Sequence, residues 1–150
     1  MASPRRQGRE VALQILCAVD GNTDLDASAA LGFYAAQVAG SEDEEAGLPD
    51  PNSYDRAFTE SLVARATEKR EEIDRAITQV SRTWRLDRMA KVDRNILRLA
   101  VAELLFFPEI PARVTINEAV ELAKRYGAAE SPSFVNGLLD SALKALELPK

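Results

Sequence analysis

The sequence predicts an all-α fold, a helical bundle of about seven helices joined by short connections. Apolar residues recur at intervals of three and four along most of the chain, which is the spacing of one helix face. No segment alternates apolar and polar residues for long enough to form a strand. Serine, proline and glycine stand at the ends of several apolar segments, where they start and stop helices.

The first helix is expected to begin at Ser3 and Pro4, with serine as the N-cap and proline at the first helical position. Helical spacing of apolar residues continues to about Asp20, and Gly21 ends the pattern. A second, alanine-rich helix is expected over about 24–38.

An acidic loop is expected at about 40–52, where five carboxylates occur without Lys or Arg and equal the net charge of −5. Pro49 and Pro51 close it. We expect one domain over 1–150, with an N-terminal helical half (about 3–38) and a larger C-terminal half (about 53–148). Net charge is therefore a poor guide to local charge in either half.

The C-terminal half is expected to hold five helices, which start near residues 53, 71, 86, 115 and 131. The third, from Leu86 to Phe107, is apolar nearly all round after Ile96 and should be the buried centre of the bundle. Thr115 to Glu118 matches a capping box. Gly127 should end that helix in the left-handed conformation.

Ser131-Pro132 is expected to start the last helix in the same way as Ser3-Pro4. The Asn136-Gly137 pair within this helix costs helix propensity. Close packing against another helix or the close approach of a ligand would each explain the glycine.

Residues that carry most enzyme chemistry are missing. The chain has no histidine and a single cysteine, Cys17, which excludes Ser-His-Asp and Cys-His nucleophilic schemes and His-containing zinc sites. Cys17 lies among apolar residues and should be a small core residue. Glu103, alone in an apolar helix, should be bound by a neighbouring helix end or an arginine. We expect a binding protein without catalysis, cofactor or metal.

The expected location is the cytosol. No stretch reaches the 18 apolar residues of a membrane helix, and no apolar signal-peptide core follows the N-terminal arginines. A single cysteine, which cannot form an internal disulfide, fits a reducing compartment.

Arg5, Arg6 and Arg9 lie in the first turns of the first helix, where cations oppose the helix dipole. Glu10 is the next acidic residue along the chain, so the cluster has little local compensation. Two interpretations stand side by side, a contact for the phosphates of a nucleic acid and a solvated, frayed terminus. Phe134, near Glu130 at the start of the last helix, either stacks on an unpaired base or is partly core.

Several segments together resemble the NusB family of transcription antitermination factors. They are Arg5 to Gln14, Val92 to Arg98 with Glu103 to Leu105, Ile110-Pro111, Ile116 to Lys124, and Ser131 with Phe134 to Asp140. The last four occur in the family's order over most of the final 60 residues. Residues 21–85 resemble the family only in helical pattern.

The resemblance implies an all-helical fold of two packed subdomains and antitermination on ribosomal RNA operons. Family members bind the boxA element of nascent RNA together with NusE, a small-subunit ribosomal protein, and the complex acts on RNA polymerase. The implied RNA-binding residues are Arg5, Arg6, Arg9, Glu130 and Phe134. The implied NusE-facing residues are Asp87 and Asp93.

Three departures bear on this transfer. Gln7-Gly8 interrupts a run of arginines that is often denser, Cys17 stands where an aromatic is frequent, and the acidic loop has no family counterpart. Monomers and homodimers that hide the RNA surface are both compatible with the family. The alternative functions are a detached accessory RNA-binding domain of an rRNA methyltransferase type and a helical protein-protein adaptor without RNA affinity.

Overall fold

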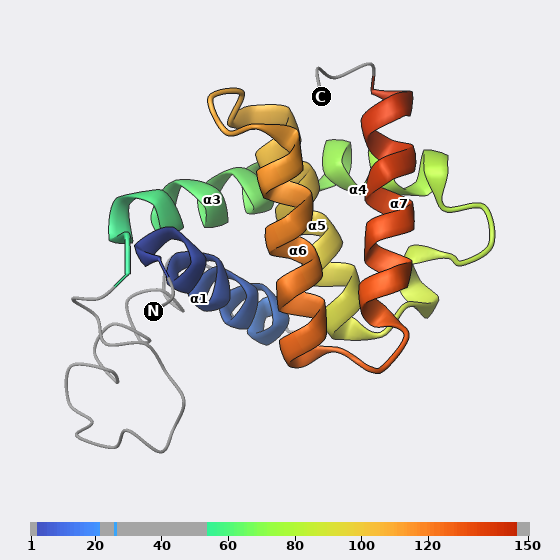
Figure 1. Cartoon of the computed structure of the whole chain (residues 1–150), viewed down its shortest axis with the longest axis horizontal. Coiled ribbons are helices and arrows are strands. Elements are labelled where there is room, and N and C mark those ends of the chain that lie inside the picture. Colours follow the sequence, from blue (N-terminus) through green and yellow to red (C-terminus); the bar gives the residue numbers. More distant parts are fainter. Residues whose placement is uncertain (1–2, 22–25, 27–53, 147–150) are drawn as a thin grey trace. The chain divides into compact units, whose positions relative to one another are not determined.

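The computed structural model describes residues 3–21, 26 and 54–146, and in these residues it is all-helical, which confirms the predicted fold class. The described residues form six α-helices and one short 3₁₀ turn. Figure 1 shows how the helices are arranged within the chain. They are α1 (Pro4–Val19), α3 (Arg56–Glu68), α4 (Arg70–Val80), η2 (Leu86–Arg88), α5 (Lys91–Phe106), α6 (Ala112–Tyr126) and α7 (Ser131–Ala145). The expected helix over 24–38 and the acidic loop over 40–52 lie outside the described residues.

The chain divides into two compact units, Met1–Ala64 and Arg65–Lys150. The boundary falls within α3. None of the described helices is both long and apolar enough to cross a membrane.

The start and the end of α1 follow the local signals in the sequence. Ser3 Oγ accepts a hydrogen bond from the Arg6 backbone N–H at 3.1 Å, and Pro4 occupies the first turn. Gly21 follows the helix with φ +81°, a conformation that glycine adopts without strain. Cys17, expected as a core residue, is only half-buried.

The N-cap of α3 is Asp55, whose Oδ1 accepts a hydrogen bond from the Phe58 backbone N–H at 3.0 Å. The helix therefore begins at Arg56, three residues after the predicted start. A single residue, Lys69, separates α3 from α4, with φ −104° and ψ 21°. This break has no Gly or Pro, which is why the sequence did not mark it.

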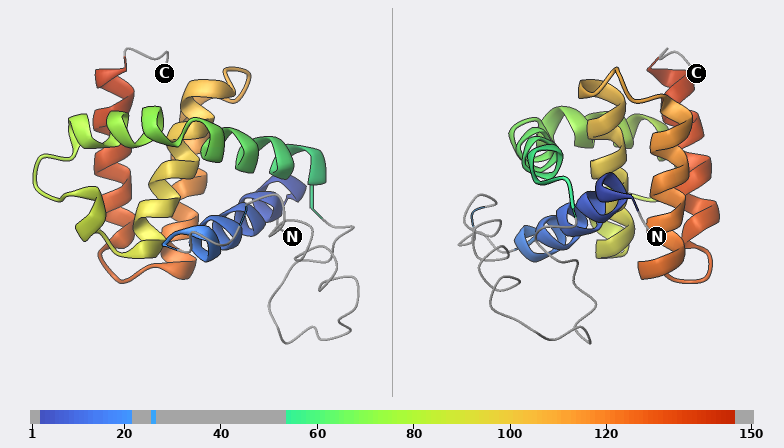
Figure 2. Two further views of the ribbon diagram at one scale, coloured as in Figure 1. Left: turned by 180° about the vertical axis from the view of Figure 1, so that it is seen from behind. Right: turned by 60° about the vertical axis from the view of Figure 1, so that its left-hand side comes forward.

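In the C-terminal unit α5 packs against α4, α6 and α7, while α6 and α7 lie side by side (Figures 1 and 2). Every residue from Asn95 to Leu104 is buried, which confirms the prediction that this helix is the buried centre. Its predicted start at Leu86 is wrong. Residues 86–88 form a 3₁₀ turn, and the extended backbone of Met89 and Ala90 separates this turn from α5 because Met89 is buried there.

The predicted capping box at Thr115 is also wrong. Helix α6 begins one turn earlier, at Ala112, so Thr115 lies inside the helix. Its hydroxyl is paired at 3.1 Å with Oε1 of Glu103 on α5, and both residues are buried. Glu103 is thus bound by a side chain of the neighbouring helix α6, where a helix end or an arginine was expected, and this contact takes the hydroxyl that the capping box would have used.

The connection between α6 and α7 differs from its prediction at two residues. Gly127 has φ −93° and is not left-handed. A Cβ there would lie 2.6 Å from Cβ of Ser131, so glycine is required by close packing. Ser131 is the first residue of α7, not its N-cap, and its Oγ accepts a hydrogen bond from the Ala128 backbone N–H at 2.9 Å. This bond ties the connection to the helix.

Candidate nucleic-acid interface

Two arginines of the predicted cluster lie over the same aromatic ring. The guanidinium carbon of Arg5 is 4.9 Å from the ring centroid of Phe58, and that of Arg9 is 5.2 Å away. Phe58, on α3, is buried, with 6% of its surface exposed. Both distances are within the range of a cation–π interaction. The ring therefore holds two cations close together at the start of α1.

Asp55 gives this cluster a carboxylate that the local sequence does not reveal. Its Oδ2 is 3.8 Å from Nε of Arg5, and its backbone N–H donates to the Pro4 carbonyl at 3.0 Å. The expectation of little compensation before Glu10 is therefore wrong for Arg5, because the partner lies 50 residues away. The side chains are 49% and 37% exposed, so this ion pair is weak and a phosphate can compete for Arg5.

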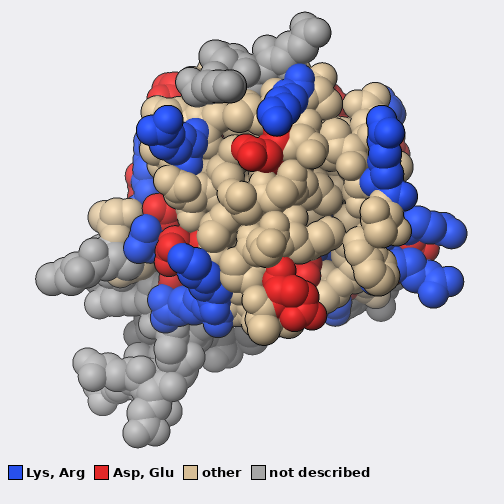
Figure 3. All heavy atoms as spheres, turned by 45° about the vertical axis from the view of Figure 1, so that its right-hand side comes forward, with Lys and Arg blue, Asp and Glu red and all other residues tan. Residues whose placement is uncertain are grey.

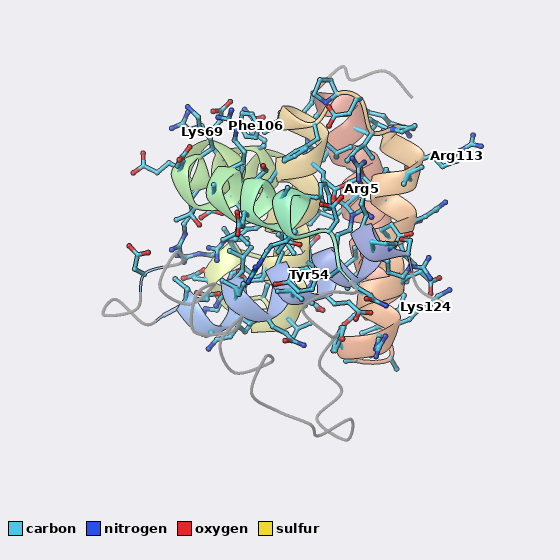
Figure 4. The ribbon with its side chains drawn as sticks, turned by 90° about the vertical axis from the view of Figure 1, so that its left-hand side faces the viewer. Arg5, Tyr54, Lys69, Phe106, Arg113 and Lys124 are labelled. Atoms are coloured by element: carbon cyan, nitrogen blue, oxygen red, sulfur yellow. The ribbon has the colours of Figure 1, made fainter. Side chains whose placement is uncertain are left out.

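The three arginines differ in exposure. Arg5 is exposed, Arg6 is half-buried, and Arg9 is buried with only 4% of its surface accessible. Figure 4 shows Arg5 at the N-terminal end of α1, beside the segment that leads through Tyr54 into α3. Of the three, Arg5 has the guanidinium most accessible to a ligand, and Arg9 supports the ring from a buried position.

Gly8 interrupts the run of arginines for a packing reason. A Cβ on Gly8 would lie 2.5 Å from Oγ1 of Thr59, a fully buried residue whose hydroxyl donates to the Asp55 carbonyl at 2.9 Å. Because Thr59 is β-branched and hydrogen-bonded, it cannot easily move away. The glycine thus lets α1 approach the start of α3, where Asp55 and Phe58 meet the arginines.

Gly8→Ala should therefore destabilise the protein by about 1–2 kcal/mol, because overpacking outweighs the gain in helix propensity. Gly137→Ala is the matched control, since a Cβ there meets nothing within 4 Å. It should stabilise by up to about 1 kcal/mol. Urea unfolding of both variants measures the difference, and equal midpoints would contradict the packing role of Gly8.

The open surroundings of Gly137 also exclude one explanation from the sequence. Close packing within the described residues does not account for this glycine, which is exposed on α7.

Glu130 and Phe134 lie at the start of α7, in the C-terminal unit. The Phe134 backbone N–H donates to the Glu130 carbonyl at 3.1 Å. Glu130 is exposed and Phe134 is half-buried, so part of the aromatic ring is accessible and part belongs to the core. The interpretation that Phe134 is partly core is therefore confirmed, and its stacking on a base stays a prediction.

Asp87 and Asp93 lie on η2 and in the first turn of α5. Asp87 is exposed and pairs with Arg85 at 3.3 Å, a weak contact at the surface. The carboxylate of Asp93 lies in the first turn of α5, where a negative charge interacts favourably with the helix dipole. Its Oδ1 is buried and, among the described residues, has no hydrogen-bond partner. An unsatisfied buried acceptor is unusual in a folded protein.

Figure 3 shows one face of the molecule, on which Lys and Arg lie mainly at the margins of a broad uncharged area. Within the described residues, no cluster of Cys, Asp and Glu has the geometry to hold a metal ion. The arrangement on α1 and α3 thus offers cations and a buried ring, which suits binding of an anion.

Phe58 and Asp55 are the site residues that sequence reasoning missed. The signal for Asp55 was present, because Asp is a preferred N-cap residue directly before an apolar helix. Nothing in the sequence pairs either residue with α1, since that contact depends on the tertiary fold.

Comparison with known proteins gives consistent matches over nearly the whole chain. The model of the NusB family matches residues 6–144. The transcription antitermination protein NusB of Myxococcus xanthus is 46% identical over 145 residues, covering 97% of this chain and 98% of the relative. Its counterpart in Geotalea daltonii is 44% identical over 146 residues, covering 96% and 97%.

Solved structures agree with these matches. NusB of T. maritima superimposes with a TM-score of 0.75 at 37% identity, over 96% of this chain and 93% of that one. A chain from the crystal structure of the antitermination factors NusB and NusE in complex with dsRNA gives 0.75 at 26% identity, over 93% and 96%. On its sequence and its fold, this chain is a member of the NusB family.

Proposed function

We propose that this chain is a transcription antitermination factor, which binds boxA-type single-stranded RNA together with NusE and promotes processive transcription of ribosomal RNA operons. It acts by binding and not by catalysis, and its complex with RNA and NusE acts on RNA polymerase. This takes place in the cytosol. Membership of the NusB family supports this function, as do relatives with that name and a solved relative in complex with NusE and RNA.

The observation that carries the RNA contact is the arginine pair on Phe58. Arg5 offers an exposed guanidinium that forms only a weak ion pair with Asp55. The buried Arg9 contacts the same Phe58 ring as Arg5 and holds that ring in place. A phosphate can displace Asp55 because an exposed ion pair at 3.8 Å adds little stability. Arg6 is the second arginine for phosphate contact, one residue further along α1.

The remaining site residues extend this proposal. Glu130 and the accessible part of Phe134 contribute a polar group and a stacking surface for a base. Asp87, which is exposed, and Asp93, in the first turn of α5, face NusE.

The test is a titration of labelled boxA-like and scrambled RNA at two salt concentrations. Arg5→Ala combined with Arg6→Ala should weaken boxA binding about tenfold and reduce the slope of log K against log salt by about 1.4, because two phosphate contacts are lost. Arg113→Ala with Lys144→Ala is the control, since both residues are exposed cations on other helices.

Adding NusE should increase the RNA affinity of the unaltered protein. Sedimentation of the free protein shows whether it is a monomer or a homodimer in these titrations. A protein without sequence preference, and without response to the arginine substitutions, would be an adaptor that does not bind RNA. If the arginine variant and its control lose the same RNA affinity, the effect comes from the overall charge and not from Arg5 and Arg6.

A further inference from the structure

The connection between α4 and α5, residues 81–90, carries the only tryptophan of the chain. We call this segment the Trp84 loop. Trp84 is 55% exposed. Figures 1 and 2 show the connection projecting from the helices of the C-terminal unit. A single exposed apolar side chain is common in folded proteins, so the surroundings of Trp84 decide whether it marks a binding site.

The loop is ordered by its own contacts. The hydroxyl of Ser81 donates to the Trp84 carbonyl, and the Met89 backbone N–H donates to the Leu86 carbonyl at 3.3 Å. The Arg94 guanidinium also donates to the Leu86 carbonyl, at 3.2 Å, and Met89 is buried. The backbone that carries the exposed indole is therefore already ordered by hydrogen bonds. Ligand binding would then lose little backbone conformational entropy.

The charge around Trp84 is positive, although the whole chain is acidic. Between residues 82 and 94 there are five Lys or Arg residues and two Asp residues. Arg85 is paired with Asp87 at 3.3 Å. Arg82 and Arg88 are both exposed, and within the described part of the chain neither guanidinium makes an ion pair. Two exposed cations therefore flank the tryptophan in the sequence.

This combination fits a nucleic acid better than a protein surface. A protein hot spot usually places Trp within a wider apolar patch. Among the described residues the other exposed large apolar side chain is Val114, which is on α6. Besides Trp84, the exposed residues of the loop are three arginines with Thr83, Asp87 and Ala90. An indole that stacks on a base, with cations for the adjoining phosphates, is the arrangement that binds single strands.

We propose that the Trp84 loop is a second contact for single-stranded RNA, in which one unpaired base stacks on the indole while Arg82 and Arg88 hold neighbouring phosphates. It extends the proposed function and rests on it for the choice of RNA. Within the loop, Trp84, Arg82 and Arg88 are assigned to RNA, while Asp87 remains assigned to NusE. Stacking is tolerant of base identity, so this contact adds affinity for RNA without adding sequence preference.

Tryptophan fluorescence tests this directly, because all indole emission comes from Trp84. Fluorescein-labelled boxA-like RNA and a uridine 12-mer are titrated while anisotropy reports binding and Trp84 emission reports stacking. Both RNAs should quench the emission at least twofold. Trp84→Ala should weaken binding of the uridine 12-mer by at least about fivefold, and Trp84→Phe should retain most of the affinity.

The cations are tested separately. Arg82→Ala with Arg88→Ala should reduce the salt slope by about 1.4, whereas Arg113→Ala with Lys144→Ala removes the same charge elsewhere and should change it less. Far-UV circular dichroism establishes that every variant is folded. An equal effect of the two double substitutions would overturn the role of the loop arginines.

The other outcomes are distinct. Binding of boxA-like RNA without a change in Trp84 emission would overturn this inference and leave the proposed function standing. Quenching by NusE but not by RNA would assign the loop to the protein partner, which also overturns it. No binding of any RNA by anisotropy would remove the proposed function and this inference together.

Discussion

Replacing Asp74 by alanine should lower the free energy of unfolding by about 3 kcal/mol, because it leaves a buried guanidinium without its carboxylate. Arg98 on α5 donates to both oxygens of Asp74 on α4, from Nε at 2.9 Å and from Nη2 at 3.1 Å. The Arg98 side chain is 8% exposed and that of Asp74 is 25% exposed. Because Asp74 retains some contact with water, the expected loss is at the lower end for a buried pair.

The neighbouring hydrogen bonds leave Arg98 without an alternative acceptor in Asn95 when Asp74 is removed. Nη1 of Arg98 also donates to Oδ1 of Asn95 at 3.3 Å, and Nδ2 of Asn95 donates to the Lys91 carbonyl at 2.9 Å. Asn95 is thus already committed on both sides of its amide. Loss of Asp74 therefore leaves two N–H groups of Arg98 without these bonds.

Arg70→Ala is the matched control, since Arg70 pairs with the same carboxylate from an exposed position at 3.7 Å. Its removal should cost less than about 1 kcal/mol. Asp74→Leu combined with Arg98→Met should recover most of the stability, because an apolar pair has no charge to desolvate. Urea unfolding measures all three proteins. If Asp74→Ala and Arg70→Ala cost the same, the buried pair does not stabilise the α4–α5 contact.

Features of the fold that depend on neighbouring residues could be predicted from the sequence. The Ser3-Pro4 start of α1 is local, since the cap bonds an N–H three residues away. The burial of α5 follows from the apolar composition around its whole circumference, which no arrangement of partners would change. These predictions are confirmed.

Features that depend on tertiary contacts could not be predicted. Thr115 matches a capping box by spacing, but its hydroxyl binds Glu103 because α5 lies against it. The arginines of α1 are isolated along the sequence, but Asp55 and Phe58, some 50 residues distant, contact Arg5 in the fold. Arg5 stays a predicted site residue, and the groups that position it, Asp55 and Phe58, could be found only in the structure.

Phe58→Ala should give the largest loss at the candidate interface. Truncating a buried phenylalanine costs about 3–5 kcal/mol, and the same change removes the ring beneath Arg5 and Arg9. Unfolding in urea and RNA titration should therefore both show a defect. Loss of stability alone would weaken RNA binding indirectly, so this variant does not separate the two roles of the ring.

Phe58→Leu makes that separation, since leucine fills most of the space but has no π face. Stability should fall by less than about 1.5 kcal/mol, while boxA affinity should fall severalfold because each cation–π contact contributes about 0.5–2 kcal/mol to holding an arginine. Phe106→Leu removes another ring that lies under an arginine, Arg65 at 5.9 Å in the C-terminal unit. It should leave RNA binding unchanged. If Phe58→Leu also binds RNA like the unaltered protein, the ring supports the fold only and does not position Arg5 for phosphate.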